Sequence, residues 1–284
     1  MRNAVQSMVG PAVVVAVVIG IVVTGQQPES LSITSVKDGL YYINGVGGNV
    51  GVRVTSEGVI LVDDKFPRNF SGIEAQLREV TRKPVKYVIN THHHGDHSGG
   101  NAEYIKSAEI IAHENARRNM VRADQPAPPR IVFADQTSVH LGGVEVKAHY
   151  LGSGHTNGDS VIYFPDLRTI HAGDLLHGIA PFIDYANGGN SAGWVETLNN
   201  ILALDFDTAI PGHGALMTRA DVEAFRDEFV SVRGRMTELI RSGVSKGEAP
   251  DRIKTDEISW TMRPDGLFMR RSLPGFYEEM ASNR

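Results

Sequence analysis

The stretch 91–101, with the sequence THHHGDHSGGN, has the densest group of side chains that could do chemistry. Within it, His92, His94, Asp96 and His97 follow the spacing His-x-His-x-Asp-His. Imidazole nitrogens and carboxylate oxygens are ordinary zinc ligands, and a group this close in sequence is ordered at little entropic cost. A polar loop could gather such residues by chance, but in a chain with 11 histidines the pattern arises in roughly one sequence per thousand. The spacing therefore favours a metal site.

Three more candidate ligands each follow a strand-like run and lie next to glycine. His155 lies in the sequence GSGHTNGD, Asp174 in HAGD and His213 in IPGHG. Glycine lets the backbone approach an occupied site closely because it has no Cβ atom. Taken singly, each position also fits a plain turn or the cap of a helix. Their significance comes from their order along the chain, together with the first motif.

In this order, the motifs resemble the signature of metallo-β-lactamase-fold hydrolases over about residues 32–214. The resemblance implies two zinc ions (Zn2+) per chain. It assigns the first zinc to a set of three histidines: His92, His94 and His155. It assigns the second to a set that contains one carboxylate: Asp96, His97 and His213. Asp174 would bridge both ions, as a carboxylate does in the glyoxalase II and RNase Z branches.

Two positions refine the resemblance. His94 argues for zinc, because the diiron branch of the superfamily has glutamate there. Asp174 separates the chain from the B1 and B2 β-lactamases, which have cysteine at this position, whereas the B3 enzymes lack the bridging carboxylate. The chain contains no cysteine, so thiolate ligands and disulfides are excluded. β-Lactam hydrolysis therefore stands as an alternative to the main prediction, and a glyoxalase II-like thioesterase is another.

The predicted site has a defined chemistry. Two zinc ions about 3.5–4 Å apart share a water molecule and lower its pKa from about 15.7 toward about 7, so a hydroxide bridged by both ions forms near neutral pH. This nucleophile can attack the carbonyl of an ester, thioester, lactone or lactam. Asp96 is the expected catalytic residue, because it binds the second zinc and can take the nucleophile's proton. We therefore predict a zinc-dependent hydrolase that acts on a small molecule.

Other polar residues near these motifs are candidates for supporting roles. Asp63 follows an apolar strand and resembles the strand-end aspartate that supports the metal loop in this superfamily. Asp159 would either orient a histidine ligand or cap a turn. His93 and Thr91 are off the ligand spacing and are expected to face solvent or to support the ligands. Relatives place substrate-binding groups in the segment after Asp174, which is otherwise a surface loop; the candidates there are His177, Asp184, Asn187 and Asn190.

Alternating strand and helix patterns place the motifs at strand ends. Strand patterns occur over 32–37, 40–43, 49–55, 58–62, 85–90 and 109–112, and again over 137–140, 144–151, 160–164, 169–172 and 208–210. Helical spacing occurs over 70–81, 101–106, 114–123, 194–204, 221–242 and 250–256. This repetition predicts an α/β (α+β) fold, the four-layer αββα metallo-β-lactamase sandwich. We expect one such domain over 26–218 and a C-terminal helical segment, 219–284, that packs on it.

Composition narrows the function. The chain has 284 residues and a net charge of −5, without a run of lysine or arginine, so no nucleic-acid partner is expected. This argues against an RNase Z-like nuclease. Residues 214–284 hold 12 basic and 12 acidic residues, unlike a segment that grips the anionic glutathione of glyoxalase II. Every expected ligand is present, which argues against a non-enzymatic metal-binding relative.

The first 25 residues have the pattern of an export signal. Arg2 precedes an uncharged apolar run, 9–23, and the small residues Thr24 and Gly25 follow. As a helix this run would reach about 22 Å, less than the roughly 30 Å hydrocarbon core of a bilayer. We therefore expect residues 1–25 to be a signal peptide and the protein to be periplasmic or secreted. The alternative is an uncleaved N-terminal anchor, through which alone the protein would contact a membrane.

Overall fold

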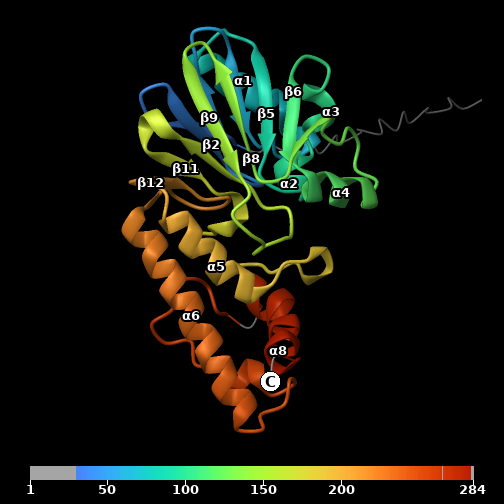
Figure 1. Cartoon of the computed structure of the whole chain (residues 1–284), viewed down its shortest axis with the longest axis vertical. Coiled ribbons are helices and arrows are strands. Elements are labelled where there is room, and N and C mark those ends of the chain that lie inside the picture. The colour runs from blue at the N-terminus through green and yellow to red at the C-terminus, as the bar shows by residue number, and fades with distance from the viewer. Residues whose placement is uncertain (1–29, 264, 283–284) are drawn as a thin grey trace, which may run out of the picture.

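The computed structural model describes residues 30–263 and 265–282. The expected signal peptide lies outside these residues, so export remains a prediction. Over the described ranges, no helix is both long enough and apolar enough to cross a membrane. The strands gather at one end of the molecule and the C-terminal helices extend from the other, as Figure 1 shows.

The first sheet, over the described residues, has seven strands in the order β1-β2-β3-β4-β5-β6-β7. They are β1 (Ser32–Lys37), β2 (Leu40–Asn44), β3 (Val50–Val54), β4 (Val59–Val62), β5 (Val85–Asn90), β6 (Glu109–His113) and β7 (Ile131–Phe133). The first four pair antiparallel, and β4 to β7 pair in parallel. Parallel neighbours need a crossover connection. Helices supply it: α1 (Phe70–Val80), α2 (Gly95–Ser98), α3 (Asn101–Tyr104) and α4 (Glu114–Arg122).

The second sheet has six strands within the same described ranges, in the order β13-β12-β11-β10-β9-β8. They are β8 (Gln136–Leu141), β9 (Val144–His149), β10 (Val161–Phe164), β11 (Thr169–His171), β12 (Thr208–Ile210) and β13 (Met217–Thr218). All neighbours pair antiparallel except β11 and β12, which pair in parallel. The connection between these two strands contains α5 (Ser191–Leu202).

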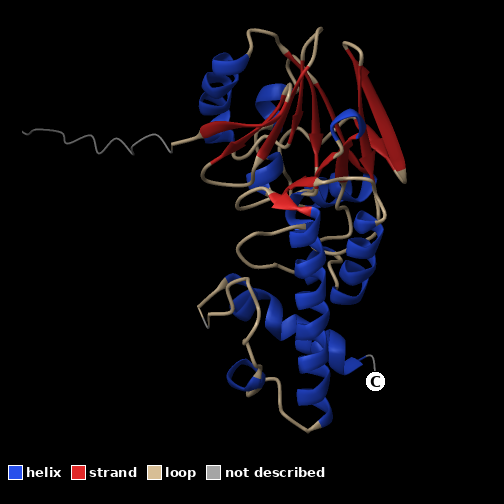
Figure 2. Cartoon of the chain, turned by 90° about the vertical axis from the view of Figure 1, so that its left-hand side faces the viewer, coloured by secondary structure: helices blue, strands red, loops and turns tan. Residues whose placement is uncertain are grey.

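Three apolar clusters separate the four layers. In β4, Val59 and Leu61 belong to the cluster beneath α1, whereas Ile60 and Val62 belong to the cluster between the two sheets. This division follows from the two-residue period of a strand. The opposite sheet contributes residues such as Ile162 of β10 to the middle cluster. The third cluster joins the second sheet to the C-terminal helices, whose long axis leads away from the strands in Figure 2.

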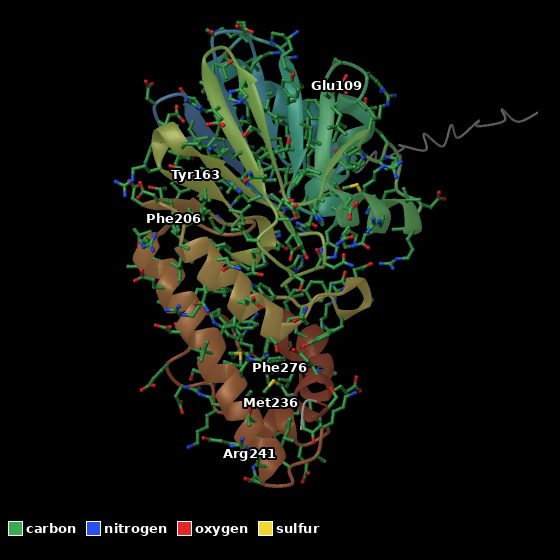
Figure 3. All side chains as sticks on the ribbon, viewed as in Figure 1. Glu109, Tyr163, Phe206, Met236, Arg241 and Phe276 are labelled. Atoms are coloured by element: carbon green, nitrogen blue, oxygen red, sulfur yellow. The ribbon has the colours of Figure 1, made fainter. Side chains whose placement is uncertain are left out.

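The C-terminal helices form the outer layer on the second sheet and extend beyond it. α6 (Arg219–Arg241) is capped by Thr218, which forms a capping box with Asp221. The later elements are α7 (Ala249–Arg252), a π-helical turn (Phe268–Ser272) and α8 (Leu273–Ser282), and 3-10 turns lie at Pro67–Asn69, Pro165–Leu167, Gly173–Leu175 and Tyr185–Asn187. Met236 of α6 and Phe276 of α8, both labelled in Figure 3, share the third apolar cluster with α5. This shared cluster holds the helices together and against the sheet.

The predicted fold class is confirmed, with local differences from the predicted elements. α5 begins at Ser191 rather than Trp194, because Asn190 caps it by accepting a hydrogen bond from the Gly193 N–H. The helix expected over 250–256 is the single turn α7. Strands β7 and β13 and the short helix α2 were not predicted, since elements of two to four residues have too little periodicity to be recognised.

Phe229→Ala should be strongly destabilising, whereas Val230→Ala should not. Phe229 is 1% exposed and its ring lies 5.1 Å from that of Trp194, while Val230 is 45% exposed. Loss of a buried aromatic ring leaves a cavity and costs about 3–5 kcal/mol. Truncation of an exposed valine should change the free energy of unfolding by less than about 0.5 kcal/mol. Equilibrium urea unfolding measures both, and equal losses would contradict this packing.

Candidate metal centre

The candidate ligands lie at one edge of the sandwich, in segments that follow strands. The 91–97 segment follows β5 of the first sheet and runs into α2, which carries Asp96 and His97, and Asp63 follows the neighbouring strand β4. His155, Asp174 and His213 lie on loops that follow β9, β11 and β12 of the second sheet. Because the two sheets pack face to face, loops from both meet at this edge. The distant parts of the sequence that carry the motifs thereby come together.

Three histidines form the first ligand set. The Nδ1 atom of His94 lies 3.2 Å from Nε2 of His92 and 2.8 Å from Nε2 of His155. One carboxylate oxygen of Asp174, Oδ2, lies 3.6 Å from His155 Nε2. His92 and His155 are buried, while His94 is partly exposed. These nitrogens and this oxygen are close enough together to hold one metal ion.

Asp96, His97 and His213 form the second set. The Nε2 atom of His213 lies 3.3 Å from both Asp96 Oδ2 and His97 Nε2. The other oxygen of Asp174, Oδ1, lies 3.2 Å from His97 Nε2 and 3.4 Å from His213 Nε2. The Asp174 carboxylate therefore lies between the two sets, with one oxygen toward each. The structure thus brings together all the ligands that the sequence predicts.

In His94 and His155, the ring nitrogen that points away from the other ligands (the outer nitrogen) has a partner that fixes the position of the ring proton. His155 Nδ1 lies 2.5 Å from the Phe182 carbonyl oxygen, which can only accept, so this nitrogen carries the proton. His94 Nε2 likewise donates to the Asp184 carboxylate at 2.9 Å. In the neutral rings, the inner nitrogens of His94 and His155 then face each other with lone pairs, 2.8 Å apart. This contact is repulsive unless a cation lies between the rings, which favours a metal site.

Asp63 orients ligands of both sets. Its Oδ2 atom accepts hydrogen bonds from His97 Nδ1 at 2.7 Å and from the Thr91 hydroxyl at 2.8 Å. Because the Thr91 proton goes to Asp63, the Thr91 oxygen accepts from His92 Nδ1 at 3.0 Å. One buried carboxylate therefore turns the inner nitrogen of His92 toward the first set and that of His97 toward the second. Such outer partners fix the tautomer and the ring orientation of metal ligands.

The two sets differ in protonation. Burial, together with neighbouring histidines, lowers the pKa of His92 well below its usual value and lowers the pKa of His155 to about 3. Burial also opposes protonation of His97 and His213, but the Asp174 carboxylate contributes strongly in the other direction. The pKa of His97 is consequently raised well above its usual value, and that of His213 is raised to about 9. Near pH 7, His92 and His155 are neutral, whereas His97 and His213 are protonated.

Asp184 and Asn187 belong to the support of His94. Asp184 accepts from His94 Nε2 and, at 2.6 Å, from the Asn187 side-chain amide. Arg122 of α4 in turn donates to the Asn187 side-chain oxygen. His93, for which solvent exposure was one expectation, is buried beside this network, and its Nε2 lies 3.8 Å from Asp184 Oδ2. These residues hold the His94 ring in place through its outer nitrogen, Nε2.

The remaining predicted polar residues divide between turns and the cleft. Asp159 accepts from the Thr156 N–H at 2.8 Å and from its hydroxyl at 2.5 Å, so its side chain holds a turn. Asn190 caps α5, and its backbone N–H donates to the carbonyl oxygen of Gly154, next to His155. His177 stacks on His213 with ring centroids 4.6 Å apart and lines the cleft over the site.

A cleft of about 510 Å³ opens onto both ligand sets. Its walls include residues that the sequence patterns did not single out: Phe66, Ile179, Phe182, Leu267 and Arg271. The Phe182 ring lies 5.8 Å from the ring of His94 and 5.5 Å from that of His155. Isolated apolar residues on loops have no characteristic spacing, and Leu267 and Arg271 lie far along the chain. No sequence signal marked them.

Two glycines allow the close packing at this edge. A Cβ atom on Gly48 would lie 2.2 Å from His97 Cε1, and one on Gly212 would lie 2.0 Å from Asp174 Oδ1. Neither position has space for a side chain. Asn49 joins the two sheets here, because its side-chain amide donates to two carbonyl oxygens of the loop that contains Gly212, at 2.9 and 3.0 Å.

Comparison with known proteins points to the same part of the chain. A family model described as the metallo-beta-lactamase superfamily matches residues 43–213. This range contains both ligand sets and Asp63. It ends before α6, so the C-terminal helices and the π-helical turn lie outside the match.

Three curated proteins are similar at 26% identity. The 2,4-dinitroanisole O-demethylase subunit alpha of Nocardioides sp. (strain JS1661) matches over 227 residues, 77% of this chain and 66% of that protein, just under two thirds of its length. Metallo-beta-lactamase type 2 of Elizabethkingia meningoseptica matches over 62% of this chain and 75% of that protein. Metallo-beta-lactamase IND-1 of Chryseobacterium indologenes matches over 56% and 69%, respectively.

Solved structures share the fold. The metallo-beta-lactamase from Pontibacter korlensis has a TM-score of 0.63 at 18% identity and covers 68% of this chain and 96% of its own. The DIM-1 metallo-beta-lactamase also has a TM-score of 0.63 at 18% identity, with coverage of 71% and 97%. At such identities the likeness concerns the fold.

Zinc binding to the second set should release protons, whereas binding to the first should release few. Zinc needs neutral imidazole. With a pKa of about 3, His155 is already neutral at pH 7, whereas His213, with a pKa of about 9, must lose a proton, as must His97. The apparent affinity of the second set should therefore fall as the pH drops from about 9 to 6, by about tenfold per pH unit for each proton released.

Calorimetric titration of metal-free protein with zinc, in buffers that differ in ionisation enthalpy, counts these protons. We expect two zinc ions per chain, with proton release largely confined to one of the two binding events. A single bound zinc, or the same proton release for both ions, would contradict the assignment.

Proposed function

The chain belongs to the metallo-beta-lactamase superfamily. From that premise we propose that it is a metal-dependent hydrolase, which binds two zinc ions and cleaves an ester, thioester, lactone or lactam bond in a small molecule. The observation that carries the proposal is the position of Asp174, whose Oδ2 faces the first ligand set and whose Oδ1 faces the second. A carboxylate shared in this way suits two ions, because a single ion would leave the donor atoms of the other set without a metal.

The donor atoms fit zinc. The two sets consist of five imidazole nitrogens and the carboxylates of Asp96 and Asp174. Imidazole and carboxylate are good zinc ligands, and the site needs no thiolate. The first set would hold one ion and the second set the other, with Asp174 shared between them. The lone pairs that face each other within the first set would be neutralised by such an ion.

The protein's own residues would position the reaction. When bound, two zinc ions supply Lewis acidity that lowers the pKa of a water molecule toward about 7 and polarises a carbonyl group. Asp96 lines the cleft beside His213. Burial opposes its ionisation, but the hydrogen bond to His213 and the charge of His97 lower the pKa of Asp96 to about 2. Asp96 is therefore ionised at neutral pH, so it can bind metal and accept a proton from the attacking nucleophile.

The cleft suits a small substrate. Its volume of about 510 Å³ lies within the range of roughly 300–1,000 Å³ that is typical of small-molecule sites. Phe66, Ile179 and Phe182 supply apolar walls above the polar floor. A compact substrate with an apolar body would have its reactive carbonyl at the floor.

Two alternative functions have support among the relatives. β-Lactam hydrolysis is suggested by the two relatives that are named metallo-beta-lactamases. Cleavage of an activated aryl methyl ether is suggested by the relative named as a 2,4-dinitroanisole O-demethylase subunit. Asp174 in place of the B1 and B2 cysteine makes us rank general carbonyl hydrolysis above β-lactam hydrolysis.

A hydrolysis panel on zinc-loaded protein tests the function. The substrates are an aryl acetate, a thioester, a γ-lactone, a chromogenic cephalosporin and 2,4-dinitroanisole. We expect turnover of at least one oxygen ester, thioester or lactone, abolished by chelation and restored by zinc. Preferential turnover of the cephalosporin or of the ether would favour the respective alternative. Protein that holds two zinc ions and hydrolyses none of the carbonyl substrates would contradict the proposal.

Asp96→Asn tests the proton-transfer role. The variant should keep the fold and much of the first zinc site, because the nitrogens of His92, His94 and His155 do not depend on Asp96. Loss of a general base typically costs about 10²–10⁴-fold in rate. We expect activity to stay that low even when excess zinc has restored full occupancy, as measured by elemental analysis. Full recovery of activity would mean that Asp96 is only a ligand.

The pH profile provides a companion measurement. In the wild type, kcat/KM should rise with pH through an apparent pKa near 7. Rates that stay flat from pH 5 to 9, with metal retained, would count against a nucleophile that is generated at the metal centre.

A further inference from the structure

One wall of the cleft carries a permanent positive charge that the hydrolytic machinery does not use. Arg271 lies in the π-helical turn Phe268–Ser272, and it is the one lysine or arginine among the described residues that line this cleft. Within the described ranges, no carboxylate lies within ion-pair distance of its guanidinium. Its side chain faces the opening above the ligands.

Stacking holds the Arg271 side chain in place. The guanidinium carbon lies 4.3 Å from the centroid of the Phe182 ring, a cation–π contact. Phe182 in turn lies nearly parallel to the ring of His94, with centroids 5.8 Å apart and an angle of 28° between the planes. A stacked guanidinium keeps its N–H groups free at its edge, where they can donate in pairs to a planar oxyanion. The charge is thus one aromatic ring away from a candidate metal ligand.

The backbone that carries Arg271 is fixed to the rest of the cleft. The Ser272 hydroxyl accepts a hydrogen bond from the Ile183 N–H at 3.0 Å, and the Thr261 N–H donates to the Ile179 carbonyl oxygen at 2.7 Å. Both contacts join the C-terminal segment to the loop that carries Phe182. π-helical turns are rare and are often found at functional sites. Here the turn presents Arg271 to the cleft while Ser272 stays buried.

The charges around the cleft favour an anionic partner for Arg271. The two carboxylates that line it, Asp96 and Asp174, belong to the ligand sets and would be neutralised by metal. The neighbouring wall residues Ile179 and Leu267 are apolar. With the metals bound, the cleft would have no free negative charge to compete for this arginine.

We propose that Arg271 binds a carboxylate group of the substrate, so that the enzyme prefers small esters or lactones with a carboxylate about one aromatic ring away from the bond that is cleaved. This inference deepens the proposed function and rests on it. Arg271 lies beyond residues 43–213, so it is a specificity-determining residue of this chain's own C-terminal segment.

A matched substrate pair tests the inference. 4-Acetoxybenzoate has a carboxylate across a rigid ring from its acetyl ester, and 4-acetoxybenzamide replaces it with a neutral amide of similar shape. Arg271 is exposed, so a charge-assisted pair there should favour the carboxylate by about fivefold in kcat/KM. Arg271→Met should reduce this preference to within about twofold, chiefly by lowering the rate with 4-acetoxybenzoate, while the zinc content stays unchanged. Arg271→Lys should keep part of the preference.

Arg270→Met is the control. Arg270 precedes Arg271 in the same turn and is exposed, but it does not line the cleft. This variant should keep the full preference for 4-acetoxybenzoate. A preference that persists in Arg271→Met, or an equal loss of both rates in that variant, would overturn the proposal.

Equilibrium binding provides a readout that needs no turnover. Terephthalate can place one carboxylate at the metal centre and the other at Arg271, whereas terephthalamate has one carboxylate and one amide. Calorimetry on zinc-loaded wild type should show about fivefold tighter binding of terephthalate, and Arg271→Met should bind both probes alike. If the wild type binds in this way but hydrolyses neither ester, the proposed hydrolysis of such esters fails and the anion site stands. If it hydrolyses both esters and binds both probes equally, the anion site fails and the hydrolase stands.

Discussion

The candidate centre depends on one constraint: the histidine rings of the first set must be held with their lone pairs pointing at one another. Thr91, Asp184 and the Phe182 carbonyl oxygen each accept a hydrogen bond from the outer nitrogen of one of these rings. The inner nitrogens are then left facing inward in a buried space. Such an arrangement is unfavourable by itself and becomes favourable with a cation, so that metal binding adds to the stability of the fold. The carboxylate of Asp63 is central, because it orients rings of both sets.

The rest of the fold explains how this constraint is met. Two sheets carry the ligands, and neither could form the centre alone. The cluster between the sheets fixes their separation, while Asn49 joins them at the edge where the loops meet. On the far side of the second sheet, Trp194 of α5 packs near His155, with ring centroids 6.1 Å apart, and Phe229 of α6 packs on Trp194. The apolar layer behind the sheet thus reaches the ligands through two aromatic rings.

Much of this could be predicted from the sequence, and the reason is local periodicity. The strand and helix patterns predicted the sandwich, and the ligand motifs lie at the strand ends where the structure brings them together. Asp63 was recognisable because it directly follows an apolar strand. The walls of the cleft were not, because Phe182, Leu267 and Arg271 are single residues whose role depends on where the chain returns after many residues. The sequence also could not decide whether Asp159 holds a turn with Thr156, as observed, or orients His155, since both interpretations fit the same few residues.

The metal-binding floor of the cleft and part of its wall come from different segments of the chain, and this has a consequence for how such enzymes can diverge. The floor comes from residues matched by the family. Part of the wall comes from a segment that carries no ligand and that is hydrogen-bonded to the Ile179 carbonyl oxygen and to the Ile183 N–H. Mutations in that segment can reshape the cleft while the ligands stay in register. A lineage could therefore exchange one substrate for another by drift at its C-terminal end, and keep a working metal centre at every step.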